Sequence, residues 1–235
     1  MKIDIKEALS FFDYPEEDRW EPHATPIIAI LGEELNVCAF KHYLEHKEHA
    51  QVTILTDPVT TGHIKGKRLD RWLRVEINGL VSGYQCEIKN WASTAINGKR
   101  LPLDANDEET LRIAKINWDN QLKTFTRRND YPNHVTKVFV KMNPPKKLEG
   151  AEIHPLILYW MPVSKGSTLN PKFTVDTSNF NNPDIFTDFR SLTVFSASLY
   201  LRSLLPSQGT IECSDENMSR VLRRLEILSK ICIRN

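Results

Sequence analysis

The sequence predicts an α/β protein in which a mixed β-sheet is flanked by helices. Three observations support this fold class. Residues 25–46 and roughly 104–125 carry helix start signals, residues 51–91 contain alternating apolar and polar positions typical of half-buried strands, and further apolar, strand-like segments follow. With 235 residues and 40% hydrophobic side chains, the chain is long and apolar enough to bury a sizeable core.

The first predicted helix covers residues 25–46. Thr25 is suited to the N-cap, and Pro26 to the first helical position, where its missing N–H costs no hydrogen bond. Two acids, Glu33 and Glu34, lie inside the apolar run of this helix. A helical wheel places Glu34 on the more apolar arc, so we expect Glu34 to be the buried acid, and Glu33 is the alternative.

Three strands are expected after this helix. They are residues 51–55, 67–77 and 84–91, and residues 77–83 supply the loop between the last two. In the second strand, alternation places Asp70 opposite the aliphatic face, and in the third it places Glu87 and Lys89 on one polar face. We therefore expect the two acids and the lysine to converge on one polar groove.

These three side chains suit the hydrolysis of a phosphodiester. Two carboxylates can hold Mg²⁺, or Mn²⁺ in its place, while an adjacent ammonium orients or deprotonates a water molecule. An acid followed two residues later by lysine also occurs at residues 4–6 and 45–47. Only Glu87 and Lys89 follow a strand that carries another acid, so the context selects this copy as the candidate metal site.

A second helix is expected from about residues 104–109 to residue 125, because acids gather at the end that the helix dipole favours for them. Residues 134–142 then predict a return strand. Gln121 lies on this helix. Gln121 is either a surface amide on an amphipathic helix or a residue of the site, an interpretation that the family resemblance described next implies.

The order of these elements resembles the PD-(D/E)XK, or restriction-endonuclease-like, nuclease superfamily, whose core runs helix, three strands, helix, strand. The resemblance covers roughly residues 25–142, and Glu34, Asp70, Glu87 and Lys89 carry it. One departure is that leucine, not proline, precedes Asp70, so the subfamily stays open. Gln121 resembles the glutamine that exonuclease-like branches place on the helix after the lysine strand.

The resemblance implies a Mg²⁺-dependent nuclease that cleaves DNA. In it Glu34, Asp70 and Glu87 would bind the metal, Lys89 would position the attacking water, and Gln121 would assist. One alternative is a nuclease that acts on RNA. Another is a non-catalytic module of the same fold that binds nucleic acid or a protein partner. The plainest alternative is an ordinary ion pair on a solvated sheet face.

The net charge of +1 hides an asymmetry along the chain. Residues 1–50 carry 5 basic and 11 acidic side chains, a balance of −6, and the remaining residues carry +7. Basic residues surround Asp70 and could neutralise phosphates: Lys65, Lys67, Arg68, Arg71 and Arg74, with Lys99 and Arg100 after the third strand. Trp72 and Trp91 share the faces of the acids, and they could stack on bases or pack under the second helix.

Four cysteines show no CxxC spacing, and we expect reduced thiols, with Cys38 and Cys86 on buried faces. The chain has neither a long apolar run nor a signal-peptide core at its start. These features favour a cytoplasmic protein that does not contact a membrane.

Three regions are expected: an N-terminal segment (residues 1–24), a nuclease-like core (25–145) and a C-terminal extension (146–235) packing on that core. Within the extension, residues 155–163 predict a strand and residues 164–186 a polar loop. Residues 186–205 and 217–233 predict helices. This helix pair could cover the core, form a homodimer interface or contact DNA.

Overall fold

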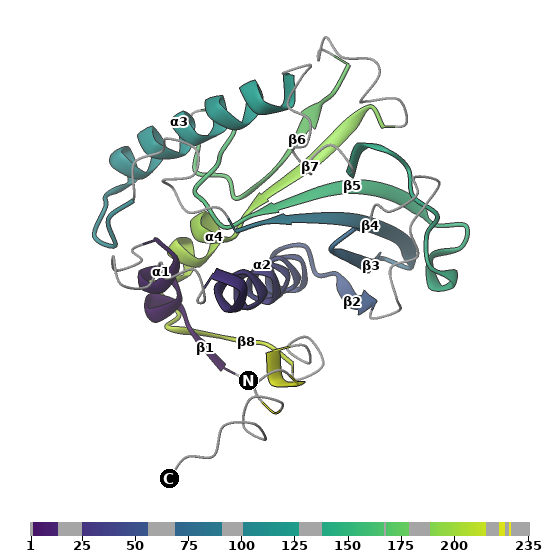
Figure 1. Ribbon diagram of the computed structural model, residues 1–235, viewed down its shortest axis with the longest axis horizontal. Helices are drawn as coiled ribbons and strands as arrows, with labels where there is room; N and C mark the ends of the chain where they lie inside the picture. The colour runs from purple at the N-terminus through teal and green to yellow at the C-terminus, as the bar shows by residue number, and fades with distance from the viewer. Residues whose placement is uncertain are drawn as a thin grey trace.

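The computed structural model describes residues 2–13, 25–55, 69–90, 101–126, 138–166, 168–178, 189–214, 221–223 and 226. These residues form a mixed α/β fold around a six-stranded sheet of order β2-β3-β4-β5-β7-β6. Figure 1 shows helix α3 on one side of this sheet and α1, α2 and the small β1–β8 pair on the other. The expected fold class is confirmed at this level.

The first half of the sheet is an antiparallel meander behind a long helix. Its elements are α2 (Thr25–Lys47), β2 (Gln51–Leu55), β3 (Arg71–Ile77) and β4 (Leu80–Lys89). The predicted helix and strands are confirmed, but the loop after β3 is shorter than expected. Asn78 and Gly79, with φ of 52° and 80°, form a two-residue turn. Turns with positive φ at both residues match the twist of a β-hairpin. Strand β4 can therefore begin directly after the turn, at Leu80.

The chain then crosses over the sheet through α3 (Asp107–Thr126) and returns as β5 (Glu152–Tyr159), parallel to β4. The predicted second helix is confirmed. The order helix, three strands, helix, strand is therefore present, but the expected return strand at residues 134–142 is wrong for its described part, residues 138–142. The side chain of Gln85 bonds to the carbonyls of Val138 and Val140 and to the N–H of Met142. These backbone groups are thus satisfied without a strand.

Two more strands complete the sheet. Strand β6 (Lys172–Asp176) lies where a polar loop was expected, and β7 (Ser191–Ser196) occupies the first half of an expected helix. That helix, α4 (Ala197–Leu204), starts only after Ser196, whose hydroxyl accepts a hydrogen bond from the N–H of Leu199. Strand β7 is buried on both faces, so its apolar run does not alternate and resembles a buried helix.

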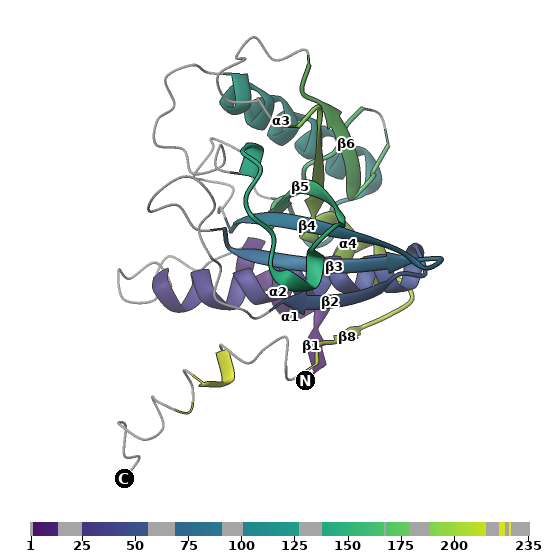
Figure 2. The same ribbon diagram turned by 90° about the vertical axis from the view of Figure 1, so that its right-hand side faces the viewer.

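Two apolar cores lie on opposite faces of the sheet. One packs α1 (Ile5–Asp13), α2 and α4 against strand residues such as Leu73 and Cys86. The other packs α3 against the opposite face, which Trp72 and Ile157 line. Figure 2 shows β2 to β5 side by side with β6 steeply inclined to them, as the twist of the sheet requires.

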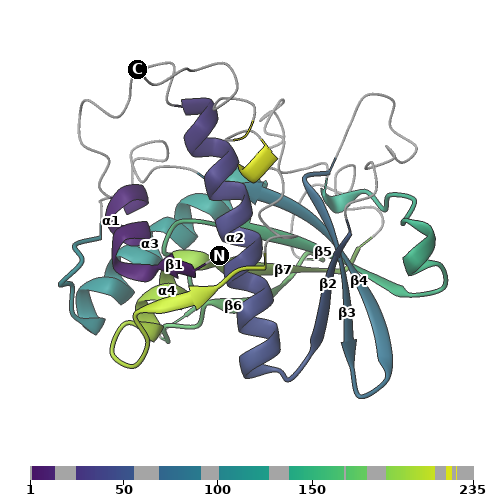
Figure 3. The ribbon, with the colours of Figure 1, turned by 90° about the horizontal axis from the view of Figure 1, so that it is seen from below.

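The N-terminal strand β1 (Lys2–Asp4) pairs with β8 (Thr210–Glu212), and this small sheet lies against α2 on the side away from the main sheet (Figure 3). Residues 221–223 and 226 are helical, whereas most of the helix predicted over residues 217–233 lies outside the described residues. Within the described part of the chain, none of the helices is both long and apolar enough to cross a membrane.

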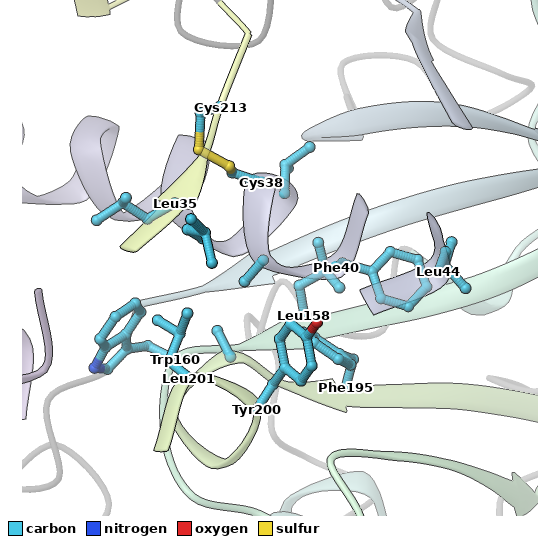
Figure 4. Close-up of a cluster of buried hydrophobic side chains, with 14 of the residues drawn as sticks. Leu35, Cys38, Phe40, Leu44, Leu158, Trp160, Phe195, Tyr200, Leu201 and Cys213 are labelled. Carbon is cyan, nitrogen blue, oxygen red and sulfur yellow. A yellow bond between two sulfur atoms is a disulfide. The ribbon is translucent and has the colours of Figure 1, made fainter. Parts of the chain in front are cut away.

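A disulfide joins Cys38 of α2 to Cys213 at the end of β8, with the two Cα atoms 5.8 Å apart (Figure 4). The expectation of reduced thiols is therefore wrong for this pair. The two cysteines are 175 residues apart in the sequence, and only the packing of β8 on α2 brings them together. Cys86 is free and buried, and burial raises the pKa of its thiol well above the ordinary value.

Candidate active site at the ends of strands β3 and β4

Asp70 lies immediately before β3, where two hydrogen bonds tie it to β4. Its carboxylate Oδ2 accepts a hydrogen bond from the N–H of Ile88 at 2.7 Å, and its own N–H donates to the carbonyl of Cys86 at 3.1 Å. The strands are antiparallel, and Arg71 is paired with Cys86. Asp70, just before Arg71, and Glu87, just after Cys86, therefore lie at the adjacent ends of the two strands.

Glu87 and Lys89 lie on the face of β4 that α3 covers. Cys86 and Ile88 belong to the core around α2, so the alternating residues point to the other side, as the sequence predicts. The Lys89 ammonium donates to Oε1 of Glu87 at 2.6 Å, and only 12% and 1% of the two side chains is exposed. A buried ion pair adds little net stability over apolar residues of similar size.

Tyr159 is a neighbour of this ion pair that the sequence analysis missed. Strand β5 runs parallel to β4, and their register places Tyr159 beside Lys89. Burial raises the pKa of the Tyr159 phenol well above its ordinary value, and the negative charge of Glu87 raises it further. The only sequence signal was a tyrosine within an apolar strand, which does not separate a site residue from a core residue.

Glu34 reaches this region from α2 through Arg71. Glu34 is buried with 2% of its surface exposed, whereas Glu33 is partly exposed, as the helical wheel indicates. The Arg71 guanidinium donates through Nη2 to the Glu34 carboxylate and through Nη1 to the main-chain carbonyl of Asp70, the latter at 2.9 Å. The structure therefore joins Glu34 to Asp70 through Arg71, one of the basic residues that we expected to neutralise phosphates.

The same turn of α2 also contacts the residue after Lys89. The side-chain nitrogen of Asn36, fully buried, donates to the carbonyl of Gly32 at 2.9 Å and to the side-chain oxygen of Asn90. Gly32 packs so closely on Asn90 that a methyl group there would come within 2.2 Å of its side-chain nitrogen. Helix α2 therefore touches both strand ends that carry the candidate residues.

Gln121 lies on α3 and is fully buried. Within the described residues, neither its amide nitrogen nor its amide oxygen has a hydrogen-bond partner. The interpretation of Gln121 as a surface amide is therefore wrong. Trp118 and Phe125, one helical turn to either side, line the core on this face of the sheet, and so does Trp72, which packs there and is not open to a base.

Other residues of the expected site lie outside the described residues. These are Trp91 and the basic residues Lys65, Lys67, Arg68, Lys99 and Arg100. Arg74 is described, and its guanidinium pairs with Glu76 at 2.8 Å on the β3–β4 hairpin. The expected basic surface around Asp70 is thus described only at Arg71, which is buried, and at Arg74.

The donor atoms suit a hard cation but are few. Asp70 and Glu87 offer carboxylate oxygens, and Mg²⁺ is commonly held by one or two carboxylates while keeping several waters. In the parts of the chain that the structure describes, no three or more His, Cys, Asp and Glu side chains gather into a group able to hold a metal ion. Glu34 and Glu87 are each bonded to a cation of the chain, Arg71 and Lys89 respectively, whereas the Asp70 carboxylate accepts from the N–H of Ile88.

Comparisons of this chain with protein-family models, with curated proteins and with solved structures find no match.

Proposed function

We propose that this protein is a metal-dependent nuclease that cleaves DNA, with Asp70 and Glu87 binding Mg²⁺ and Lys89 orienting the attacking water. The observation that carries the proposal is that the Asp70 carboxylate is bonded to the N–H of Ile88, the residue between Glu87 and Lys89 on the neighbouring antiparallel strand. The order helix, three strands, helix, strand around them supports it. The sequence resembles the PD-(D/E)XK superfamily by these acids, this lysine and this order of elements, with β5 now in the place of the return strand expected at residues 134–142.

Each side chain has a chemical part in this proposal. Bound Mg²⁺ would neutralise charge on the scissile phosphate and lower the pKa of a bound water. The N–H of Ile88 holds the Asp70 carboxylate against β4, so this carboxylate is ordered before any ligand binds. The Lys89 ammonium, held against Glu87, can donate a hydrogen bond to the attacking water or take part in its proton transfer.

The test combines metal binding with cleavage. Isothermal titration of Mn²⁺ into wild type and Asp70→Ala is followed by incubation of both proteins with linear, circular and single-stranded DNA, and with RNA of the same sequence. We expect wild type to bind Mn²⁺ and cleave DNA, and Asp70→Ala to lose both activities while its circular dichroism stays unchanged. Cleavage of RNA alone would replace DNA by RNA as the substrate, and cleavage that survives Asp70→Ala would exclude this site.

One observation favours a second candidate, a non-catalytic module that binds nucleic acid or a protein. Within the described residues the acids do not form a group of three, and the carboxylates of Glu34 and Glu87 each pair with a cation of the chain itself. The same titration separates the two candidates. A wild-type protein that takes up no Mn²⁺ but shifts DNA in a gel would support the module and exclude the nuclease.

A further inference from the structure

We infer that one turn of α2, residues 32–36, is a clamp that holds the two strand ends of the site together, and that Glu34 serves in it as the counter-ion of Arg71, not as a metal ligand. The inference rests on the proposed function insofar as the clamp positions metal-binding residues. It assigns to Glu34, Arg71 and Asn90 positioning roles that neither the motif nor its spacing indicates.

The first step is the charge balance of Arg71. Only 6% of the Arg71 side chain and 2% of the Glu34 side chain is exposed, and the two groups are bonded. An uncompensated buried guanidinium would be strongly destabilising, and the Glu34 carboxylate supplies opposite charge to Arg71. A Glu34 carboxylate that turned to a metal ion would give up this bond. We therefore assign Glu34 to the arginine.

The second step is that Arg71 also contacts the backbone of Asp70. Its other guanidinium nitrogen donates to the main-chain carbonyl of Asp70, while the Asp70 carboxylate accepts from Ile88. Asp70 is thus held at its carbonyl by Arg71, which Glu34 of α2 holds in turn, and at its N–H and side chain by β4. Strand β2 pairs with β3 only from Trp72 onward, so the arginine contact adds to the order that β4 supplies.

The third step is the contact at the other strand end. Asn36, two residues after Glu34 on the same helix, donates to the Asn90 side chain, and Asn90 packs on Gly32. Asn90 directly follows Lys89. One helical turn therefore sets the position of the backbone at Asp70 and at Lys89, and with it the spacing between the acid of β3 and the acid and lysine of β4.

The experiment is a double-mutant cycle of Glu34→Gln and Arg71→Gln, read by titration of Mn²⁺ into folded protein. Residues that act as one unit give non-additive losses. We expect each single variant to raise the Kd for Mn²⁺ about tenfold. We expect the Kd of the double variant to be no higher than the higher of the two single-variant values. We expect Arg71→Lys, which keeps the charge and one donor, to restore part of the affinity.

The matched control is the double change Lys172→Gln and Glu48→Gln, which removes a partly exposed ion pair that has no part in the proposed site and should leave the Mn²⁺ affinity unchanged. If Glu34 were a metal ligand, Glu34→Gln would abolish binding, whereas Arg71→Gln would leave it unchanged or tighter. That pattern, or two single variants with wild-type affinity, would overturn the clamp.

A second measurement separates the clamp from the proposed function. The N–H of Ile88 bonds to the Asp70 carboxylate, so its hydrogen exchange reports the position of Asp70 without any metal. We expect exchange of this amide to become about tenfold faster in Arg71→Gln than in wild type. If wild type binds no Mn²⁺, the proposed function fails, and the exchange rate still decides the clamp. Unchanged exchange in Arg71→Gln would overturn it.

Discussion

Gly32 of α2 lies against Asn90, the residue after Lys89, so closely that a Cβ atom on Gly32 would meet the Asn90 side-chain nitrogen at 2.2 Å. Glycine in the interior of a helix normally costs about 1 kcal/mol relative to alanine. At this position the close approach explains its presence. The Asn90 side chain cannot easily turn away, because the Asn36 amide is bonded to its oxygen.

The first prediction is that Gly32→Ala destabilises the protein, against the usual gain from alanine in a helix. Overpacking a well-ordered contact costs about 1–3 kcal/mol, against a gain of about 1 kcal/mol in helix propensity. We expect a net loss of up to about 2 kcal/mol in the free energy of unfolding, measured in urea. Gly209→Ala is the control, since no atom lies within 4 Å of a Cβ built there. A stabilised Gly32→Ala variant would contradict the close contact.

The second prediction separates metal binding from catalysis at Lys89. Lys89→Ala removes the ammonium but neither acid, so Mn²⁺ binding should persist while cleavage of DNA falls by about 10²–10⁴, the usual contribution of a proton-transfer group. Single-turnover cleavage and calorimetric titration on the same preparation measure the two effects. Lys123, an exposed lysine on α3, provides the control variant Lys123→Ala. Full cleavage by Lys89→Ala would remove Lys89 from the mechanism.

Periodicity predicted the parts of the fold in which one face of an element is buried. The helix before β2, the strands β2, β3 and β4, and the common face of Glu87 and Lys89 follow from the spacing of apolar residues. The same rule failed for β7, because Leu192 and Val194 face one core while Phe195 faces the other. A strand buried on both faces has no alternation to detect.

The remaining features depend on contacts between distant parts of the chain. Residues 138–142 have strand-like composition, yet the Gln85 side chain binds their backbone. The Arg71–Glu34 pair joins residues 37 positions apart. The helical wheel indicates the burial of Glu34 but not its partner, and Arg71 does not differ in the sequence from an ordinary surface charge, since only the tertiary fold decides which charged residues are buried together. For the same reason the sequence indicated Glu34 as a candidate metal ligand but not its ion pair with Arg71.

The third prediction concerns the stability of the protein in mild acid. His42 of α2 is buried, with its Nδ1 2.7 Å from the Tyr200 hydroxyl and its ring stacked on His46 at 3.9 Å. Burial is the main cause that lowers the pKa of His42 from 6.5 to about 4, and the charge of His46 adds to it; Lys41 and Lys47 act in the same direction, and Glu45 opposes them. At a pH between these two pKa values, His42 binds a proton in the unfolded chain but not in the folded protein.

The free energy of unfolding should therefore fall as the pH decreases from about 6.5 towards 4. We expect wild type to lose roughly 1–2 kcal/mol more than His42→Gln between about pH 6.5 and pH 5, measured by urea unfolding at each pH. His49→Asn is the control, because His49 is exposed and asparagine tolerates its positive φ of 54°. Parallel pH profiles for wild type and His42→Gln would contradict the prediction.

The last prediction concerns the disulfide between Cys38 and Cys213, which ties β8 to the helix that carries Glu34. A disulfide stabilises mainly by restricting the unfolded chain, and its removal typically costs about 2–4 kcal/mol. Cys213→Ser should lower the free energy of unfolding by that amount, and a dithiol reductant should destabilise wild type equally but leave Cys213→Ser unchanged. Cys86→Ala is the control, since it should keep the effect of the reductant. Alkylation of unfolded, unreduced protein should label Cys86 but not Cys38 or Cys213; labelling of Cys38 would show that the bond is absent and that packing alone holds β8 on α2.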